Sequence, residues 1–149
     1  MIKRRRSTNR RGAVLVETAI VLPVTILLLL GTMVAGLGVF RYNQIAYLTR
    51  LGARWASVHG PNYQTDQKKS APTAADVMAG AVTPYLSGIN AGDLTPTLTW
   101  NTGATPATVT FRLSYRWLPE ISYASFLPKG ATTTSAVTLS STSTQLITY

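Results

Sequence analysis

A run of 28 residues with a single charged side chain, Ala13–Phe40, constrains this chain more than any other feature. As a helix it would be about 42 Å long, whereas the hydrocarbon core of a bilayer needs only about 20 residues. The run exceeds the roughly 7–15 apolar residues of a cleavable secretory signal. A chain of 149 residues could not easily bury such a helix on every side. The sequence therefore predicts a transmembrane helix over residues 13–40.

The basic residues are concentrated before this run. Six of the fourteen lysines and arginines lie in the first eleven positions, and only Arg41 follows the run closely. The positive-inside rule therefore predicts a cytoplasmic N-terminus and an extracytoplasmic location for everything after Phe40. Because the net charge of +9 belongs mostly to the N-terminal tip, it does not indicate nucleic-acid binding, which needs basic residues spread over a folded face.

The helix is predicted to continue outside the membrane, over residues 41–60. This segment has no internal proline or turn cluster before Gly60-Pro61-Asn62, which is typical of a helix end. Its apolar residues recur at steps of three and four, which indicates one buried stripe. The stripe consists of Ile45, Leu48, Gly52, Trp55 and Ala56, with Arg41, Gln44, Arg50 and Arg54 largely off it. We expect one helix from Ala13 to about Val58.

Proline and glycine residues mark special positions within the span. Pro23 is expected to kink the helix, because its ring displaces the carbonyl of Ala19 and removes one hydrogen bond. Gly31, Gly36 and Gly38 are either contact points for a second helix or ordinary glycines of a membrane helix.

Glu17 is the one charge within the span. An uncompensated charge at the centre of a membrane helix costs roughly 2.5–3.5 kcal/mol. If a protease cut after Gly12, Ala13 would gain a free amine four residues from Glu17, near a helix N-terminus that favours negative charge. That amine, or the amine of a neighbouring subunit, would offset the cost only in the right register. The alternative is a glutamate at headgroup level without a partner.

Basic residues, a glycine, a glutamate five residues later and a long apolar helix resemble a type IV prepilin cleavage signal. More specifically, "RRGAVLVETAIVLPVTILLLLG" resembles the N-terminal helix of the TadE-like family, the minor pilins or pseudopilins of tight adherence pilus systems. "LTRLGARWASVHG" resembles a second element of that family, here Arg50, Gly52, Ala53 and Arg54. The resemblance covers about residues 10–60. One departure is Thr18, where many relatives have an aromatic residue.

The resemblance implies that a prepilin peptidase removes residues 1–12 by cutting between Gly12 and Ala13. It also implies a single-pass protein of the bacterial inner membrane that assembles with other pilins or pseudopilins on a pilus assembly platform. In that interpretation Glu17 fixes the register of assembly. The alternative is an anchored extracytoplasmic binding or envelope-complex protein that is not cleaved and forms no filament.

Residues 61–149 are predicted to form an extracytoplasmic α+β head. "PNYQTDQKKSAP" reads as a loop, and Thr73 and Asp76 have capping-box spacing before a short helix over residues 74–82 that resumes through Pro84. Alternating apolar residues predict strands over residues 94–100, 107–118 and 134–149, with "NTGATP" as a hairpin turn and "PEISYASFLPKG" as a longer connection. The alternative for the Ser/Thr-rich C-terminus is a disordered or glycosylated stretch. The expected fold is a long N-terminal transmembrane and amphipathic helix packed on a small antiparallel sheet, as in a pilin.

The residue types that catalysis or metal binding would need are scarce. There is no cysteine, and the single histidine, His59, is expected to cap the helix end or face solvent. Asp66, Asp76, Asp93 and Glu120 are widely spread, and no phosphate loop, HExxH or GxSxG motif occurs. We expect a protein that is not an enzyme and holds no metal or cofactor.

Overall fold

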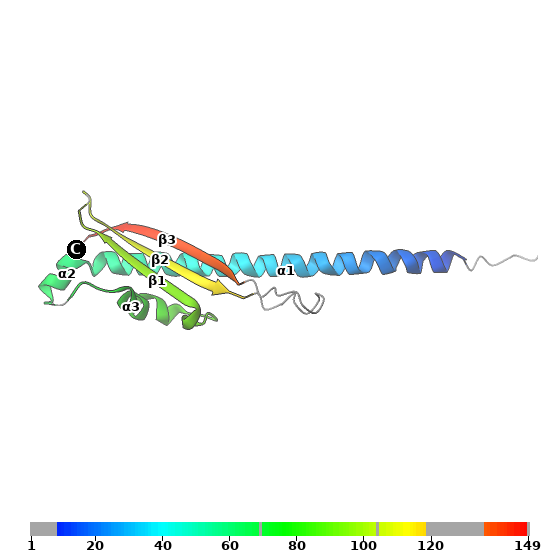
Figure 1. The fold of residues 1–149 in the computed structure, drawn as a ribbon, viewed down its shortest axis with the longest axis horizontal. Helices are drawn as coiled ribbons and strands as arrows, with labels where there is room; N and C mark the ends of the chain where they lie inside the picture. The colour runs from blue at the N-terminus through cyan, green and yellow to red at the C-terminus, as the bar shows by residue number, and fades with distance from the viewer. Residues whose placement is uncertain (1–8, 69, 104, 119–135, 149) are drawn as a thin grey trace, which may run out of the picture. The chain divides into compact units, whose positions relative to one another are not determined.

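The structure is a computed structural model that describes residues 9–68, 70–103, 105–118 and 136–148 (Figure 1). The chain divides into two units, residues 1–37 and residues 38–149. The first unit is formed by the first part of helix α1, and the second contains the rest of α1 and all other elements. These elements are α1 Asn9–Val58, α2 Pro61–Asp66, α3 Ala74–Val77, η1 Met78–Val82, η2 Thr83–Tyr85, η3 Ala91–Asp93, β1 Leu94–Asn101, β2 Thr108–Trp117 and β3 Val137–Leu146.

Helix α1 ends at Val58, as predicted, but begins at Asn9 and not at Ala13. The predicted start was too late because we took the beginning of the apolar run as the beginning of the helix. The polar residues before the run are also compatible with a helix. The helix continues through Pro23. The part of α1 within Gly12–Val58 is long and apolar enough to cross a membrane, which is consistent with a single-pass membrane protein.

The three strands form one antiparallel sheet in the order β1-β2-β3. The predicted hairpin between the first two strands is confirmed, with Leu94 opposite Tyr115 and Asn101 opposite Thr108. The Ser/Thr-rich segment forms β3, which pairs with β2 over its whole length. The predicted third strand was longer, and its residues 134, 135 and 149, like the connection "PEISYASFLPKG", lie outside the described residues.

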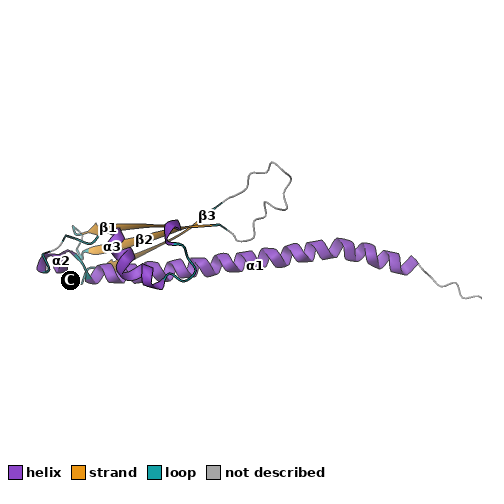
Figure 2. Cartoon of the chain, turned by 90° about the horizontal axis from the view of Figure 1, so that it is seen from below, coloured by secondary structure: helices purple, strands orange, loops and turns teal. Residues whose placement is uncertain are grey.

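The core of the second unit lies between the sheet and the C-terminal part of α1 (Figure 2). One face of β2 is buried at every second residue, through Val109, Phe111, Leu113 and Tyr115, while Arg112 and Arg116 on its other face are exposed. The predicted stripe of α1 faces this core: Ile45, Leu48, Gly52 and Ala56 are buried and Trp55 is half-buried. This arrangement confirms the predicted α+β fold.

Gly52 allows a close approach between α1 and β2. A Cβ atom at this position would lie 2.6 Å from Cε1 of Phe111 and 3.1 Å from Cγ1 of Val77. Such distances are shorter than van der Waals contact, so the aromatic ring occupies the space that a side chain would need. Gly38 likewise packs against β2, since a Cβ there would lie 3.1 Å from Cζ3 of Trp117. Gly38 thus has a contact within its own chain, and contact of these glycines with a second helix stays a prediction.

The loop predicted over "PNYQTDQKKSAP" is also wrong in its first half, where Pro61–Asp66 forms α2. Gly60 precedes it with an extended backbone, and Pro61 occupies the first turn. Proline favours that position because its missing N–H group has no partner there and its φ angle already suits a helix. The same Gly-Pro pair that ends α1 thus begins α2.

The next helical segment starts where predicted. Thr73 and Asp76 form a capping box: the Thr73 hydroxyl accepts from the backbone of Asp76, and Asp76 Oδ2 accepts from the backbone of Thr73 at 2.8 Å. The regular helix ends at Val77 and continues as the wider turn η1 and the tighter turn η2, which contains Pro84. Val77, Ala81 and Val82 are buried in this segment, so packing and not regular hydrogen bonding decides its path.

Replacing Gly52 by alanine should destabilise the second unit. Alanine is favoured over glycine by about 1 kcal/mol in a helix interior, but overpacking against Phe111 typically costs about 1–3 kcal/mol. Gly36→Ala is the matched control in the same helix, because nothing lies within 4 Å of its added Cβ. Thermal unfolding of the full-length protein in detergent, followed by near-ultraviolet circular dichroism, should give a lower Tm for Gly52→Ala only. Equal Tm values for both variants would contradict the close approach.

The capping box should make stability depend on pH in acid. The hydrogen bonds from the backbone and the hydroxyl of Thr73 lower the pKa of Asp76 below its ordinary value of 3.8. The cap therefore stabilises fully above that value and is lost as the pH falls through the lower pKa of the folded state. Unfolding measured from pH 2 to pH 6 should show that Asp76→Asn reduces stability above about pH 4 and has little effect at the acid end. A constant difference over the whole range would show that the carboxylate charge is not responsible.

Candidate functional site

The residues predicted at the cleavage and assembly site all lie on α1 in the first unit. Gly12 is the fourth residue of the helix, and both Gly12 and Ala13 are exposed. Glu17 follows one turn after Ala13, is exposed, and has no ion-pair partner among the described residues. The structure thus places the glycine, the alanine and the glutamate within six consecutive residues of one helix.

A shallow groove along α1 contains Glu17. It is lined by Val14, Glu17, Thr18, Val21, Leu22, Thr25, Ile26 and Leu29. The hydroxyl of Thr18 donates to the carbonyl of Val14 at 2.8 Å, and the hydroxyl of Thr25 donates to that of Val21 at 2.9 Å. Because both hydroxyls are already bonded within the helix, the carboxylate of Glu17 is the polar group of this groove that lacks a described partner.

The residues of the second predicted element, Arg50, Gly52, Ala53 and Arg54, lie on two different faces of α1. Gly52 and Ala53 are buried in the core of the second unit, whereas Arg50 and Arg54 are exposed one turn apart. The glycine and alanine therefore serve packing. The two arginines make no ion pair with any residue that the structure describes. The sequence analysis placed Gly52 on the buried stripe and Arg50 and Arg54 off it, which the structure confirms, but it did not predict the burial of Ala53.

Arg50 and Arg54 line a groove between the end of α1 and the end of β3. The other residues that line it are Ser57, Val58, Gln145, Leu146 and Thr148. The backbone N–H and the hydroxyl of Thr148 both donate to the carbonyl of Ser57 at 3.3 Å, which holds the end of β3 against α1. Two elements far apart in the sequence, α1 and the end of β3, therefore form the groove. Its polar groups are the guanidinium groups of Arg50 and Arg54, the amide of Gln145 and the hydroxyls of Ser57 and Thr148.

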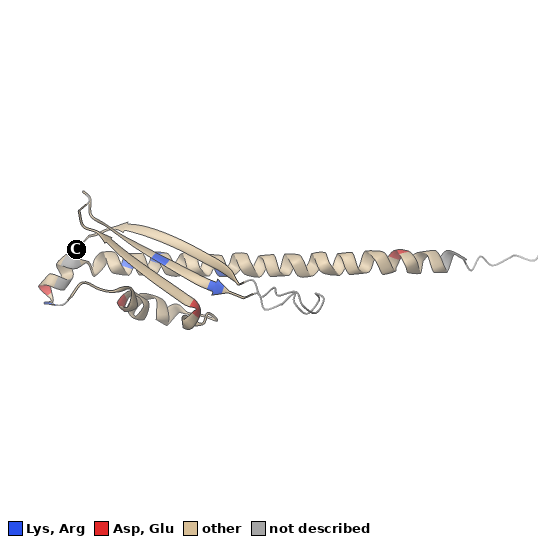
Figure 3. Ribbon diagram, in the orientation of Figure 1, with Lys and Arg blue, Asp and Glu red and all other residues tan. Residues whose placement is uncertain are grey.

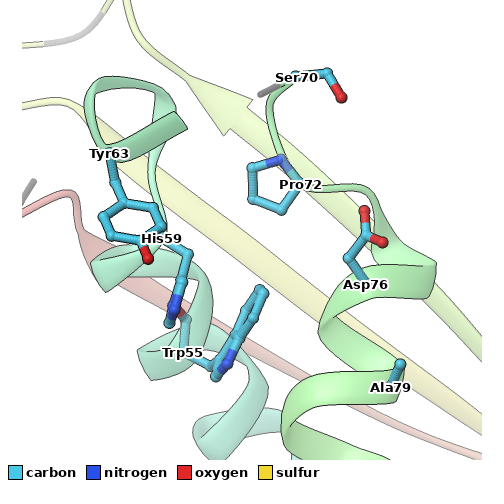
Figure 4. A pocket seen from close by; sticks show the side chains of 7 residues that line it. All are labelled: Trp55, His59, Tyr63, Ser70, Pro72, Asp76 and Ala79. Atoms are coloured by element: carbon cyan, nitrogen blue, oxygen red, sulfur yellow. The ribbon is translucent and has the colours of Figure 1, made fainter. Parts of the chain in front are cut away.

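An aromatic cluster that the sequence analysis did not predict lies at the end of α1 (Figure 4). The rings of Trp55 and His59 stack with centroids 4.0 Å apart, and the Tyr63 ring meets His59 edge-on at 5.0 Å. His59 Nδ1 donates to the carbonyl of Trp55 at 2.9 Å, since a carbonyl oxygen only accepts. This bond confirms that His59 caps the helix end.

The aromatic cluster borders a pocket of about 670 Å³, which Ser70, Pro72, Asp76 and Ala79 also line (Figure 4). A Cβ at Gly80 would lie 3.0 Å from the Trp55 ring. Both His59 and Gly80 therefore pack against the indole of Trp55. In the sequence, the four-residue spacing of Trp55, His59 and Tyr63 indicated such a cluster. The Gly60-Pro61 pair between His59 and Tyr63 suggested a loop instead. We interpret the cluster as the contact that joins α2 and η1 to α1.

Charges are distributed unevenly over the second unit (Figure 3). Its described acidic residues, Asp66, Asp76 and Asp93, lie on α2, α3 and η3, whereas the arginines lie on α1 and β2. Within the described ranges, no three His, Cys, Asp or Glu side chains lie close enough together to hold a metal ion.

Residues 12–54 match the family model described as TadE-like protein. No curated protein and no solved structure matches the chain. The matched segment begins at Gly12, includes Glu17 and Pro23, and ends at Arg54. The resemblance predicted from the sequence is therefore confirmed: residues 12–54 of this chain are similar to the TadE-like family.

Proposed function

We propose that this chain is a minor pilin or pseudopilin that takes part in assembling a tight adherence pilus. The observation that carries the proposal is the TadE-like match over residues 12–54, which begins at the predicted cleavage position and contains the one charge of the apolar span. In this role the protein is a structural component and not an enzyme, and it needs neither a cofactor nor a nucleic acid.

The proposed topology is a single pass through the bacterial inner membrane. The basic residues before Gly12 keep the N-terminus in the cytoplasm, and the unit formed by residues 38–149 is extracytoplasmic. In the described first unit most large apolar side chains are exposed; Leu15, for example, is 71% exposed, whereas Val34 is buried. Lipid, and later the helices of other pilins, would cover them.

The position of Gly12 suits proteolysis by a prepilin peptidase. Glycine is a weak helix former. The bond between Gly12 and Ala13 therefore lies where unwinding of α1 costs less than at a strong helix former. Cleavage there removes the basic leader and creates a cation at Ala13.

Glu17 then gives assembly its register. The groove around it offers no other unsatisfied polar group, so the carboxylate seeks a charged partner. The Ala13 amine of a neighbouring pilin is such a partner, and the two charges meet only when the helices are correctly aligned along their axes. Other pilins or pseudopilins, the assembly platform and the peptidase are the proposed partners.

The first test is the mature N-terminus. In cells that contain the peptidase, mass spectrometry of the membrane-extracted protein should find Ala13 as the first residue. Gly12→Leu should leave the leader in place, while Gly31→Leu, a matched change in the same helix, should not. A wild-type protein that still begins at Met1 would contradict the proposal and favour an anchored protein outside the pilus.

The second test concerns Glu17. Glu17→Ala should insert and be cleaved normally, because it removes a charge from an apolar helix. Its incorporation into pili should nevertheless fall by about tenfold or more, since a partnered intramembrane charge is worth at least ~1.4 kcal/mol. Immunoblots of sheared surface filaments would measure this. Thr18→Ala is the control from the same groove, and normal pili with Glu17→Ala would exclude the register role.

A further inference from the structure

Two arginines on α1 are held close together without a described partner. Arg50 and Arg54 are one turn apart, and like charges at this spacing weaken a helix by a few tenths of a kcal/mol. Both side chains are exposed, and both line the groove that also contains Gln145 and Thr148. A guanidinium group presents a planar fork of N–H donors that matches the two oxygens of a carboxylate. The groove therefore fits an acidic side chain from outside the described chain.

The two flanks of α1 differ in what covers them. On one flank the buried residues of α3 and η1 pack into the core, with Gly80 against the ring of Trp55. On the other flank the row of β3 that faces α1 carries Ser141, Ser143 and Gln145, opposite buried residues of β2. Leu139 of the same row packs against the core, whereas Gln145 at its other end is exposed and lines the groove with Arg50 and Arg54.

The covered flank carries the complementary charge. Residues 70–93 contain Asp76 and Asp93 and no lysine or arginine. Asp76 is exposed, and its Oδ2 accepts both hydrogen bonds from Thr73. Its Oδ1 makes no hydrogen bond to a described residue, and the lowered pKa keeps the group ionised at neutral pH. One oxygen is thus fixed by the cap while the other is available.

Asp76 and Arg54 are both neighbours of Trp55. Asp76 lines one pocket with Trp55 and His59, and Arg54 directly precedes Trp55 on the helix. Arg54 lines hollows with residues of both β3 and η1, so the basic surface extends from β3 across α1. Copies that stand parallel in one membrane and repeat along an assembly meet through two different surfaces, so the contact is heterologous. The basic surface of Arg50 and Arg54 and the separate carboxylate of Asp76 provide two such surfaces.

We propose that Arg50 and Arg54 of one copy bind Asp76 of the neighbouring copy, so that the extracytoplasmic units associate side by side. The inference rests on the proposed function for the common orientation of the copies. It adds to that function a second contact, outside the membrane, that is independent of Glu17 and of cleavage.

Charge reversal tests this contact in the full-length protein. Two differently tagged copies are produced together, extracted in mild detergent, and one tag is used to recover the other. Arg50→Glu with Arg54→Glu, or Asp76→Arg alone, should lower the recovery about tenfold or more, because like charges would then meet. Combining all three substitutions in every copy should restore the recovery, because the contact is rebuilt with exchanged charges.

Two control variants separate charge from folding. Arg112→Glu with Arg116→Glu reverses two exposed arginines on the other face of the sheet and should leave recovery unchanged. Thr73→Ala breaks the capping box but keeps the charge of Asp76, and it should also retain the contact. Unchanged recovery after the arginine reversal, or no rescue by the triple variant when it is folded, would overturn the proposal.

Cross-linking provides a measurement that does not need charge reversal. The chain has no cysteine, so a bismaleimide reagent reports only engineered positions. An Arg54→Cys copy and an Asp76→Cys copy should give a cross-linked pair in membranes, whereas Arg112→Cys with Asp76→Cys should not. An absent Arg54–Asp76 product would count against the contact even if Ala13 is the mature N-terminus. Conversely, an uncleaved protein that gives this product would retain the contact and lose the pilin assignment.

Discussion

The packing of β2 on a smooth surface of α1 is the contact on which the second unit depends. Gly52 and Ala53 present almost no side chain, so Phe111 can lie directly against the helix. The alternation of apolar and polar residues along β2 then buries one face and exposes the other. β1 and β3 follow from β2, because each pairs with it in register. A larger residue at position 52 would act at the centre of this arrangement.

The first unit is governed by a different constraint, because most of its large apolar residues are exposed. Its threonine hydroxyls bond to the helix itself, and Glu17 is the polar group left over in the groove that they line. In the proposed function, this carboxylate pairs with an amine of a neighbouring copy. In the proposed contact between extracytoplasmic units, Arg50 and Arg54 likewise find their partner on another copy.

The aromatic cluster shows why the end of α1 is more than a helix terminus. His59 closes the last turn by bonding to the Trp55 carbonyl, and its ring lies between those of Trp55 and Tyr63. Stacking and the hydrogen bond together connect α1 to α2. Gly80 also brings η1 close to the ring of Trp55. The cluster therefore places α3 and η1 beside the end of α1, with Asp76 in the pocket that Trp55 and His59 also line.

The sequence by itself determined the apolar span, the end of α1 near Val58, the capping box at Thr73 and Asp76, the three strands and the resemblance of residues 12–54 to the TadE-like family. Each follows from local periodicity, turn residues or a short motif, which act between neighbours in the chain. Only the tertiary structure decided that Gly38 meets Trp117, that Ala53 is buried with Gly52, and that the end of β3 lies beside Arg50 and Arg54. These features depend on contacts between residues up to about ninety positions apart, such as Thr148 with Ser57. No local pattern carries that information, because the space available at one residue is set by which distant side chain packs against it.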